Sequence, residues 1–289
     1  MPESPSRVVN ALSLCGGGSR GAIEVGLYQA LTELRIPIHM IFGTSIGAVN
    51  GALIAAGLTP DEIAQHWVRL QDRQLFGLSW RLLLRGLKAD SVYTTGRLQH
   101  VLEGILPVQR FEDLKIPLTV TATDLQTGEA VYLDHGELLP AIMASMALPP
   151  YFPPVEYQGR RLVDGGVVDN LPLGVAIERG ATRIFALLCH CAQELTQPTK
   201  GLLDIQARAF RIGLELKLRH DLEHYKDRAE FIILEPCFDF PPSILTLTGV
   251  QALIEQGYEF AKAEFVRRNL GIAQGSAGNR TQPTPAQSS

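Results

Sequence analysis

The chain has 289 residues, which suffices for one large α/β domain or two small ones, and we expect one. Its formal net charge of -4 and pI near 6.0 argue against a nucleic-acid-binding protein. The first residues lack the basic segment and apolar core of a secretory signal, and no apolar run is long enough to cross a bilayer. We therefore expect a soluble protein.

The amino-terminal part has the pattern of a β-α-β-α unit. Two short apolar runs alternate with two segments whose apolar or small residues recur at helical spacing. We predict strands over 8–15 and 36–42 and helices over 22–34 and 48–56. The second helix is rich in small residues, which lets it pack closely on a sheet.

Strand and helix patterns continue to alternate along the rest of the chain. Further strands are predicted over 118–124, 130–133, 161–163, 183–188 and 231–235. This alternation predicts a sheet with helices on both faces. After Leu270 the composition shifts to Gly, Ser, Thr, Pro and Gln, so we expect a domain over 8–270 and a disordered tail over 271–289.

The segment Gly43-Thr44-Ser45-Ile46-Gly47 places a serine between two glycines where a strand gives way to a helix. This is the pattern of a nucleophile elbow, a strained turn that points a hydroxyl into a cleft. Small flanking residues prevent clashes where the backbone doubles back. Ser45 is therefore the candidate nucleophile.

A glycine loop, Gly16-Gly17-Gly18-Ser19-Arg20-Gly21, follows the first strand and has two interpretations. It satisfies the Gly-x-Gly-x-x-Gly fingerprint of a dinucleotide site, but no acidic residue ends the second strand to hold the ribose. The alternative is an oxyanion hole built from the bare amides of Gly16, Gly17 and Gly18. In a parallel sheet this loop and the Ser45 elbow would face the same carboxyl edge.

The turn Asp164-Gly165-Gly166 supplies a candidate base for the serine. The preceding strand delivers Asp164, and the two glycines let the backbone turn tightly so that the carboxylate reaches a neighbouring loop. By itself an Asp-Gly pair also marks an ordinary turn. The serine motif favours the catalytic interpretation.

These three motifs, in this order, resemble those of the patatin-like phospholipases. The resemblance covers about 8–265 and includes the stretch 144–155 before the aspartate. It implies a three-layer α/β/α fold with a mainly parallel central sheet, a Ser-Asp dyad and hydrolysis of lipid acyl esters without a metal or cofactor. Carried onto this chain, the resemblance gives these roles: Ser45 nucleophile, Asp164 base, Gly16, Gly17 and Gly18 oxyanion hole, Arg20 and Gly21 loop support, and Gly43, Gly47, Gly165 and Gly166 elbow and turn glycines.

Other functions remain open at this point. An α/β-hydrolase triad would need a later histidine, and the candidates are His190, His220 and His224. That fold places its serine after several strands, and His220 and His224 lie in a charged helical pattern typical of solvated residues. A serine acyltransferase or an inactive lipid-binding protein of the same fold are the further alternatives. Arg20 could also attract a lipid phosphate.

The four cysteines, Cys15, Cys189, Cys191 and Cys237, form no disulfide framework, which predicts reduced thiols in the cytoplasm. The Cys189-His190-Cys191 run lacks a second ligand pair at zinc spacing, so we predict no metal site there.

The segment 66–88 interleaves aromatic and leucine side chains with basic ones. It fits either a lid that contacts a membrane peripherally or a helical cap packed on the domain, and the sequence favours neither. The charged helical stretch 204–226 belongs to the surface or to a partner interface. Head-group preference, acyl position and oligomeric state depend on pocket and surface shape, which sequence spacing does not report.

Overall fold

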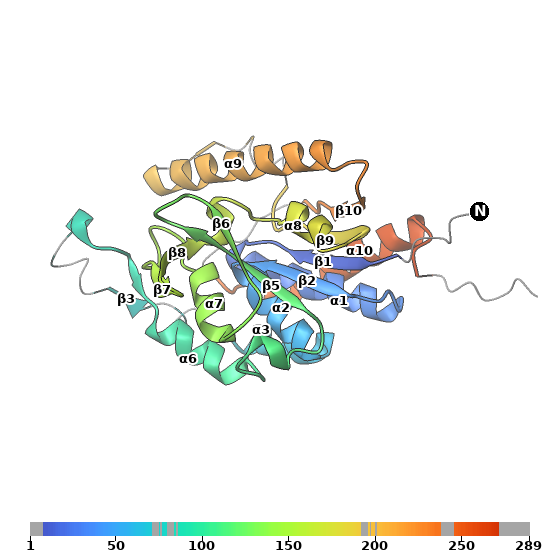
Figure 1. The fold of residues 1–289 in the computed structure, drawn as a ribbon, viewed down its shortest axis with the longest axis horizontal. Helices are drawn as coiled ribbons and strands as arrows, with labels where there is room; N and C mark the ends of the chain where they lie inside the picture. The colour runs from blue at the N-terminus through green and yellow to red at the C-terminus, as the bar shows by residue number, and fades with distance from the viewer. Residues whose placement is uncertain are drawn as a thin grey trace, which may run out of the picture.

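The computed structural model describes residues 8–70, 75, 77–79, 84, 86–191, 196, 198–199, 201–237 and 246–271. Its centre is an eight-stranded sheet with the order β10-β9-β1-β2-β5-β8-β7, and β6 pairs with β5 beside this path. Helices lie on both sides of the sheet, with α8 and α9 above it and α2, α3 and α6 below it in Figure 1. The expected α/β fold with a mainly parallel central sheet is thus confirmed.

The parallel part of the sheet carries the amino-terminal motifs. It consists of β1 (Asn10–Leu14), β2 (Met40–Thr44), β5 (Leu118–Asp124), β9 (Arg183–Leu187) and β10 (Glu230–Leu234). The antiparallel strands are β6 (Ala130–Leu133), β7 (Val155–Tyr157) and β8 (Arg160–Asp164). A separate two-stranded pair joins β3 (Gly77–Leu78) to β4 (Tyr93–Thr94).

The helices connect these strands. They are α1 (Ile23–Glu33), α2 (Ile46–Ala56), α3 (Pro60–Arg69), α6 (Gly96–Ile105), α7 (Leu138–Ser145), α8 (Leu173–Glu178), α9 (Leu202–His224) and α10 (Val250–Arg267). Short 3-10 helices are η1 (Gly18–Ala22), η2 (Gly86–Lys88), η3 (Phe111–Asp113) and η4 (Gly165–Val167). Within the described residues, no helix is both long enough and apolar enough to span a membrane.

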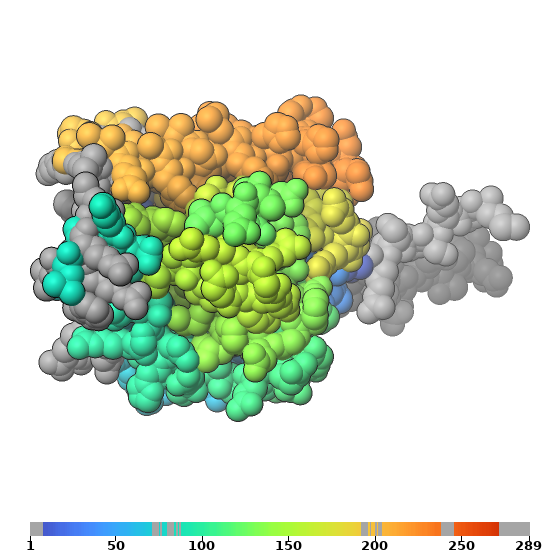
Figure 2. Space-filling view, turned by 60° about the vertical axis from the view of Figure 1, so that its left-hand side comes forward, coloured from blue at the N-terminus to red at the C-terminus, as the bar shows by residue number. Residues whose placement is uncertain are grey.

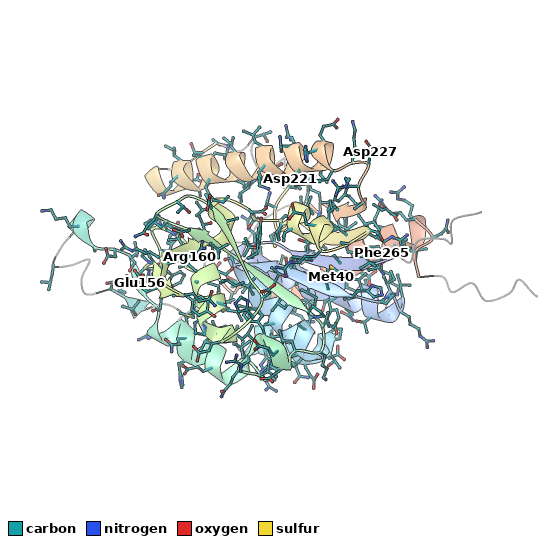
Figure 3. The ribbon with its side chains drawn as sticks, in the orientation of Figure 1. Met40, Glu156, Arg160, Asp221, Asp227 and Phe265 are labelled. Carbon is teal, nitrogen blue, oxygen red and sulfur yellow. A yellow bond between two sulfur atoms is a disulfide. The ribbon has the colours of Figure 1, made fainter. Side chains whose placement is uncertain are left out.

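Helices α1 and α10 cross at two glycines. A Cβ on Gly26 would lie 2.2 Å from the carbonyl oxygen of Ile254, and one on Gly257 would lie 2.3 Å from that of Ile23. Glycine therefore permits a backbone contact that any side chain would prevent. Phe265 of α10, labelled in Figure 3, packs edge-on against Phe185 of β9, with ring centroids 5.5 Å apart.

The elements predicted from sequence appear with shifted ends. The strand predicted over 36–42 begins only at Met40, because Pro37 has no amide to donate to a ladder. The helix predicted over 48–56 begins at Ile46, directly after Ser45. The strands over 118–124 and 130–133 have the predicted bounds.

The expectation that all four cysteines are reduced is wrong for two of them. Cys191 and Cys237 form a disulfide with a Cα–Cα distance of 5.3 Å, whereas Cys15 and Cys189 are free thiols. Strands β9 and β10 are neighbours in the sheet, so the segments after their ends meet although 46 residues separate the cysteines. Sequence spacing alone does not report that adjacency.

Candidate active site

Ser45 stands in a strained turn between β2 and α2. Its backbone has φ 54° and ψ -123°, a conformation that L-residues adopt at a cost of about 1–3 kcal/mol and that clusters at functional sites. The turn lies at the carboxyl end of β2. In Figure 3, Met40 marks the opposite end of that strand.

The glycines on either side of Ser45 are needed for close backbone contacts. A Cβ on Gly43 would lie 2.5 Å from the Gly47 oxygen, and one on Gly47 would lie 2.3 Å from the Leu14 oxygen of β1. Real Cβ atoms do not approach backbone so closely, so only glycine allows the elbow to pack against β1.

The glycine loop lies beside this elbow because β1 and β2 are adjacent parallel strands. The Gly16 amide donates to Asn170 Oδ1 at 2.9 Å, so it is already engaged. Gly18 opens η1, where the first amides of a helix lack intrahelical acceptors. Of the three predicted amides, those of Gly17 and Gly18 donate no hydrogen bond within the described part of the chain, so they remain the candidates for binding a ligand.

A buried polar chain supports the glycine loop from beneath. Glu24 accepts hydrogen bonds from the Cys15 amide (2.7 Å) and from Asn50 Nδ2 (2.9 Å). Asn50 also donates to the Gly21 carbonyl and accepts from Trp67 Nε1, both at 2.9 Å. Burial raises the pKa of Glu24 well above its usual range.

Asp164 approaches the serine from the antiparallel side of the sheet. The register pairs Thr44 with Thr121 and Ala122 with Asp164, so Ser45 and Asp164 lie at the same level on the two sides of β5. A Cβ on Gly165 would lie 2.3 Å from the Thr121 oxygen, which explains the glycine after the aspartate.

The Asp164 carboxyl is buried and only partly satisfied. Its Oδ1 accepts from the Gly166 amide at 2.8 Å, while Oδ2 has no hydrogen-bond partner among the described residues. Burial raises the pKa of Asp164 to about 6, against the lowering effects of the Ser45 hydroxyl and the Gly166 amide. Ser45 and Asp164 line the same cavity, and Asp164 Oδ2 accepts no hydrogen bond from the Ser45 hydroxyl.

The sequence analysis assigned no role to two side chains that contact the motifs. Ser145 Oγ accepts from the Ser45 amide at 2.8 Å and donates to the Thr121 carbonyl at 2.6 Å. Asn170 receives the Gly16 amide as described above. Each side chain reaches its motif only in the folded structure, because 100 residues separate Ser145 from Ser45 and 154 separate Asn170 from Gly16.

A cavity of about 580 Å³ joins these groups and continues as an apolar chamber. Ser45, Asp164 and the glycine loop line one part of it. The chamber is lined by apolar side chains of α2, α3 and α6: Val49, Leu53, Trp67, Leu98, Val101, Leu102 and Ile105. Polar side chains of α9, among them Asp204, Arg208 and Arg211, line a further part. In Figure 2, α9 runs along the top of the molecule and residues 96–113 lie along the bottom.

The three candidate histidines lie apart from the Ser45–Asp164 pair or face other groups. His190 lines the cavity, but its Nε2 is 3.2 Å from Glu215 Oε1. His220 and His224 are exposed on α9, as expected. Arg20 donates to the Cys189 carbonyl at 3.5 Å and also lines the cavity, so both sequence interpretations of Arg20 stay open.

The segment 66–88 only partly falls within the described residues. Trp67 is 4% exposed and belongs to the core, which fits a packed cap at this position. Leu78 and Leu84 are 76% and 73% exposed. Phe76, Trp80, Leu82, Leu83 and the arginines at 73, 81 and 85 lie outside the described residues.

Comparison with known proteins assigns the class. Residues 12–177 match the family model described as patatin-like phospholipase. Because this match covers more than half of the chain, the protein belongs to the patatin-like phospholipase family. The matched range contains both glycine motifs and the Asp164 turn.

Similar proteins match part of this chain and part of their own length. An uncharacterized NTE family protein of Mycobacterium tuberculosis is 40% identical over 164 residues, which cover 56% of this chain and 44% of the relative. Rat patatin-like phospholipase domain-containing protein 7 is 33% identical over 183 residues, covering 61% of this chain and 13% of the relative. This chain therefore spans less than half the length of either relative. The solved structure of VipD from Legionella pneumophila aligns with 91% of this chain and 67% of its own, at 15% identity and a TM-score of 0.49.

Proposed function

We propose that the protein is a serine lipid acyl hydrolase of the phospholipase A or lysophospholipase type. The observation that carries the proposal is the strained Ser45 turn, at φ 54°, beside the buried Asp164 carboxyl. An unstrained surface serine would need neither the positive φ nor a buried carboxyl partner. Family membership supports a lipid substrate.

The proposed reaction has two steps through an acyl-enzyme. Ser45 Oγ attacks the ester carbonyl while its proton passes to Asp164, and the Gly17 and Gly18 amides stabilise the oxyanion. The proton returns to the departing alcohol as the carbon–oxygen bond breaks. Water then attacks the acyl-serine by the reverse path and releases the fatty acid.

The cavity suits an acyl chain. Apolar side chains of α2, α3 and α6 line the same cavity as Ser45, so a hydrocarbon tail bound there would contact apolar surface. Helix α9 contributes polar side chains to the lining of the same cavity, and a head group would lie beside them. A short soluble ester would fill only the part of the cavity near Ser45.

Labelling with a fluorophosphonate, followed by peptide mass spectrometry, tests the nucleophile. We expect one adduct, on Ser45, and its loss in Ser45→Ala and Asp164→Asn. Ser91→Ala is the matched control, since its hydroxyl donates to the Tyr93 carbonyl and is not part of the cavity lining. A folded protein that is not labelled on Ser45 would remove the hydrolase proposal and favour an inactive lipid-binding protein.

Product analysis separates hydrolysis from acyl transfer. With a phospholipid substrate and an added alcohol acceptor, a hydrolase releases free fatty acid at a rate that the acceptor does not change. Acyl transfer to the acceptor as the main product would support the acyltransferase alternative.

We also propose that the described part of 66–88 contacts membranes peripherally. Leu78 and Leu84 are exposed apolar side chains, and Leu75 of the same segment lines the cavity. Replacing Leu78 and Leu84 with glutamate should lower activity on anionic vesicles more than activity on a soluble ester. Equal losses on both substrates would contradict membrane contact.

A further inference from the structure

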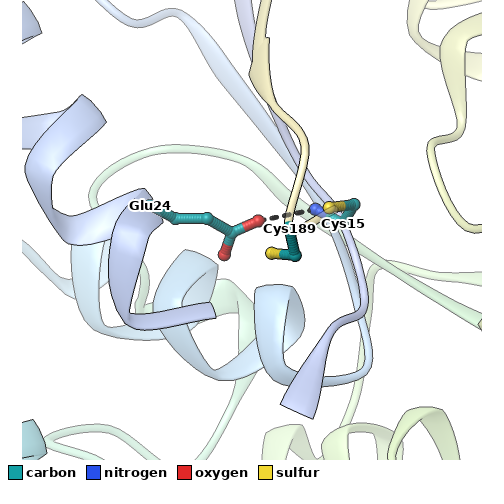
Figure 4. Close-up of side chains that lie close together, drawn as sticks. All are labelled: Cys15, Glu24 and Cys189. Atoms are coloured by element: carbon teal, nitrogen blue, oxygen red, sulfur yellow. Dashed lines mark hydrogen bonds between the residues drawn. The ribbon is translucent and has the colours of Figure 1, made fainter. Parts of the chain in front are cut away.

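Three buried side chains gather beneath the glycine loop, and the proposed catalysis uses none of them. They are Cys15 after β1, Glu24 on α1 and Cys189 after β9, each at most 1% exposed. One sulfur or carboxylate oxygen from each lies within 4.8 Å of the other two. Figure 4 shows the Cys189 sulfur and the Glu24 carboxyl turned toward each other, with Cys15 at the side.

The set is separate from the disulfide of the chain. Cys191 and Cys237 are joined to each other, which leaves Cys15 and Cys189 as free thiols. The sequence could not reveal this set, because β1 and β9 are neighbours in the sheet while their cysteines are far apart in the chain. The sequence analysis predicted no metal site at the run Cys189-His190-Cys191, and the third residue of that run, Cys191, is engaged in the disulfide.

The three ligand types suit a soft divalent cation. Two thiolates and a carboxylate around one centre match zinc, which binds sulfur at about 2.3 Å and carboxylate oxygen at about 2.0–2.2 Å. Ligands of a tetrahedral ion then lie about 3.5–4 Å apart, so small side-chain rotations close this set around an ion.

The second shell of such a site is already present. The Cys15 amide and Asn50 Nδ2 donate to the two Glu24 oxygens, which fixes the carboxylate and leaves a lone pair on each oxygen. Cys189 lines the cavity, so an ion could enter the site from the cavity.

We propose that Cys15, Glu24 and Cys189 form a zinc site with three protein ligands and a fourth position toward the cavity. The site adjoins the glycine loop at two points. Cys15 directly precedes Gly16, and a Cβ on Gly17 would lie 2.4 Å from Cys189 Cβ. An ion bound here therefore ties the loop to α1 and to the segment after β9, and it stabilises the folded protein by mass action.

Cobalt titration of the chelator-treated, reduced full chain tests the site. We expect one equivalent of Co²⁺ to produce thiolate-to-cobalt charge-transfer absorption, and Zn²⁺ to displace it. The melting temperature of the wild-type protein should rise in Zn²⁺. None of these measurements depends on ester hydrolysis, so failure of the zinc site and failure of the proposed function are distinguishable.

Variants assign the ligands. The double variant Cys15→Ser, Cys189→Ser should lose the absorption and the thermal shift. Glu24→Gln, which keeps the shape and an acceptor for the Cys15 amide, should weaken zinc binding by about tenfold or more. The reductant can open the Cys191–Cys237 disulfide and expose two further thiols, so Cys191→Ser, Cys237→Ser is the matched control. This variant should bind cobalt as the wild type does, because it keeps all three proposed ligands.

Three results would overturn the proposal. One is a wild-type spectrum without saturable thiolate absorption, which needs no variant to fold. Another is unchanged binding in the Cys15 and Cys189 double variant. The third is loss of binding in the Cys191 and Cys237 control, which would move the ion to the Cys189-His190-Cys191 run.

Discussion

Asp164→Asn should make the protein more stable while removing its activity. Asp164 is 2% exposed, and its Oδ2 has no hydrogen-bond partner among the described residues. A buried charge of this kind disfavours the folded state, and the neutral amide of asparagine avoids that cost. The amide oxygen can still accept from the Gly166 amide, as Oδ1 does now.

The pKa of Asp164 gives the magnitude and the sign. Burial raises that pKa from 3.8 to about 6, so the folded protein holds its proton more tightly than the unfolded chain does. Below about pH 4 the carboxyl is neutral in both states, so its ionisation does not change the free energy of unfolding. Between about pH 4 and 6 the unfolded chain ionises first, so wild-type stability falls as pH rises; at about 1.4 kcal/mol per pK unit, the loss reaches about 3 kcal/mol.

Urea unfolding at pH 8 and at pH 4, followed by circular dichroism, measures this difference. Asp164→Asn should exceed the wild type by about 3 kcal/mol at pH 8 and match it near pH 4. Asp227→Asn is the control, because Asp227 is exposed in the turn after α9 (Figure 3). Equal stability of wild type and Asp164→Asn at pH 8, or a difference that does not change with pH, would refute the reasoning.

Activity should follow the opposite course in the same pH range. Asp164 can accept the Ser45 proton only when it is ionised, so kcat/KM for a soluble ester should rise with pH through about 6. If Asp164 is the base, the ionised form that lowers the stability of the folded protein is also the form that accepts the proton. A flat profile between pH 5 and 7 would show that another group sets the rate.

Three further predictions concern the role of His190, the packing of the elbow and the place of the acyl chain. His190→Gln should lower kcat/KM by less than about tenfold, since His190 Nε2 faces Glu215; a loss as large as that of the aspartate variant would indicate a triad. Gly47→Ala should cost about 1–3 kcal/mol in urea unfolding, because its Cβ would meet a β1 carbonyl, whereas Gly104→Ala, with open space on α6, should gain about 0.5–1 kcal/mol. Leu102→Trp should narrow the apolar chamber and reduce the long-chain to short-chain ratio of kcat/KM by about tenfold; an unchanged ratio would place the acyl chain elsewhere.

Local patterns were sufficient to predict the class of fold, and they identified the motif residues as candidates for the site. Each glycine motif depends on the conformation of its own backbone, so a few residues around Ser45 or Asp164 are enough to recognise it. The strands over 118–124 and 130–133 were found with their bounds because apolar runs end abruptly at turn residues. The predicted start of β2 was too early, because the apolar residues around Pro37 extended the apolar run beyond the strand.

Contacts between distant segments depended on three-dimensional packing instead. The register across β5 brings Asp164, on the antiparallel strand β8, to the level of Ser45. The spacing of residues in the sequence does not show the direction of that strand. Ser145 and Asn170 reach the Ser45 and Gly16 amides for the same reason, and Asn170 leaves two rather than three loop amides available.

The cysteines show the difference between the two sources most clearly. The cysteines are scattered in the sequence, but they follow the neighbouring strands β10, β9 and β1 and therefore meet in the folded sheet. The sequence by itself determined which residues could do chemistry, since motif chemistry is local. The folded sheet determined which of them meet, because strand order and register set every long-range distance.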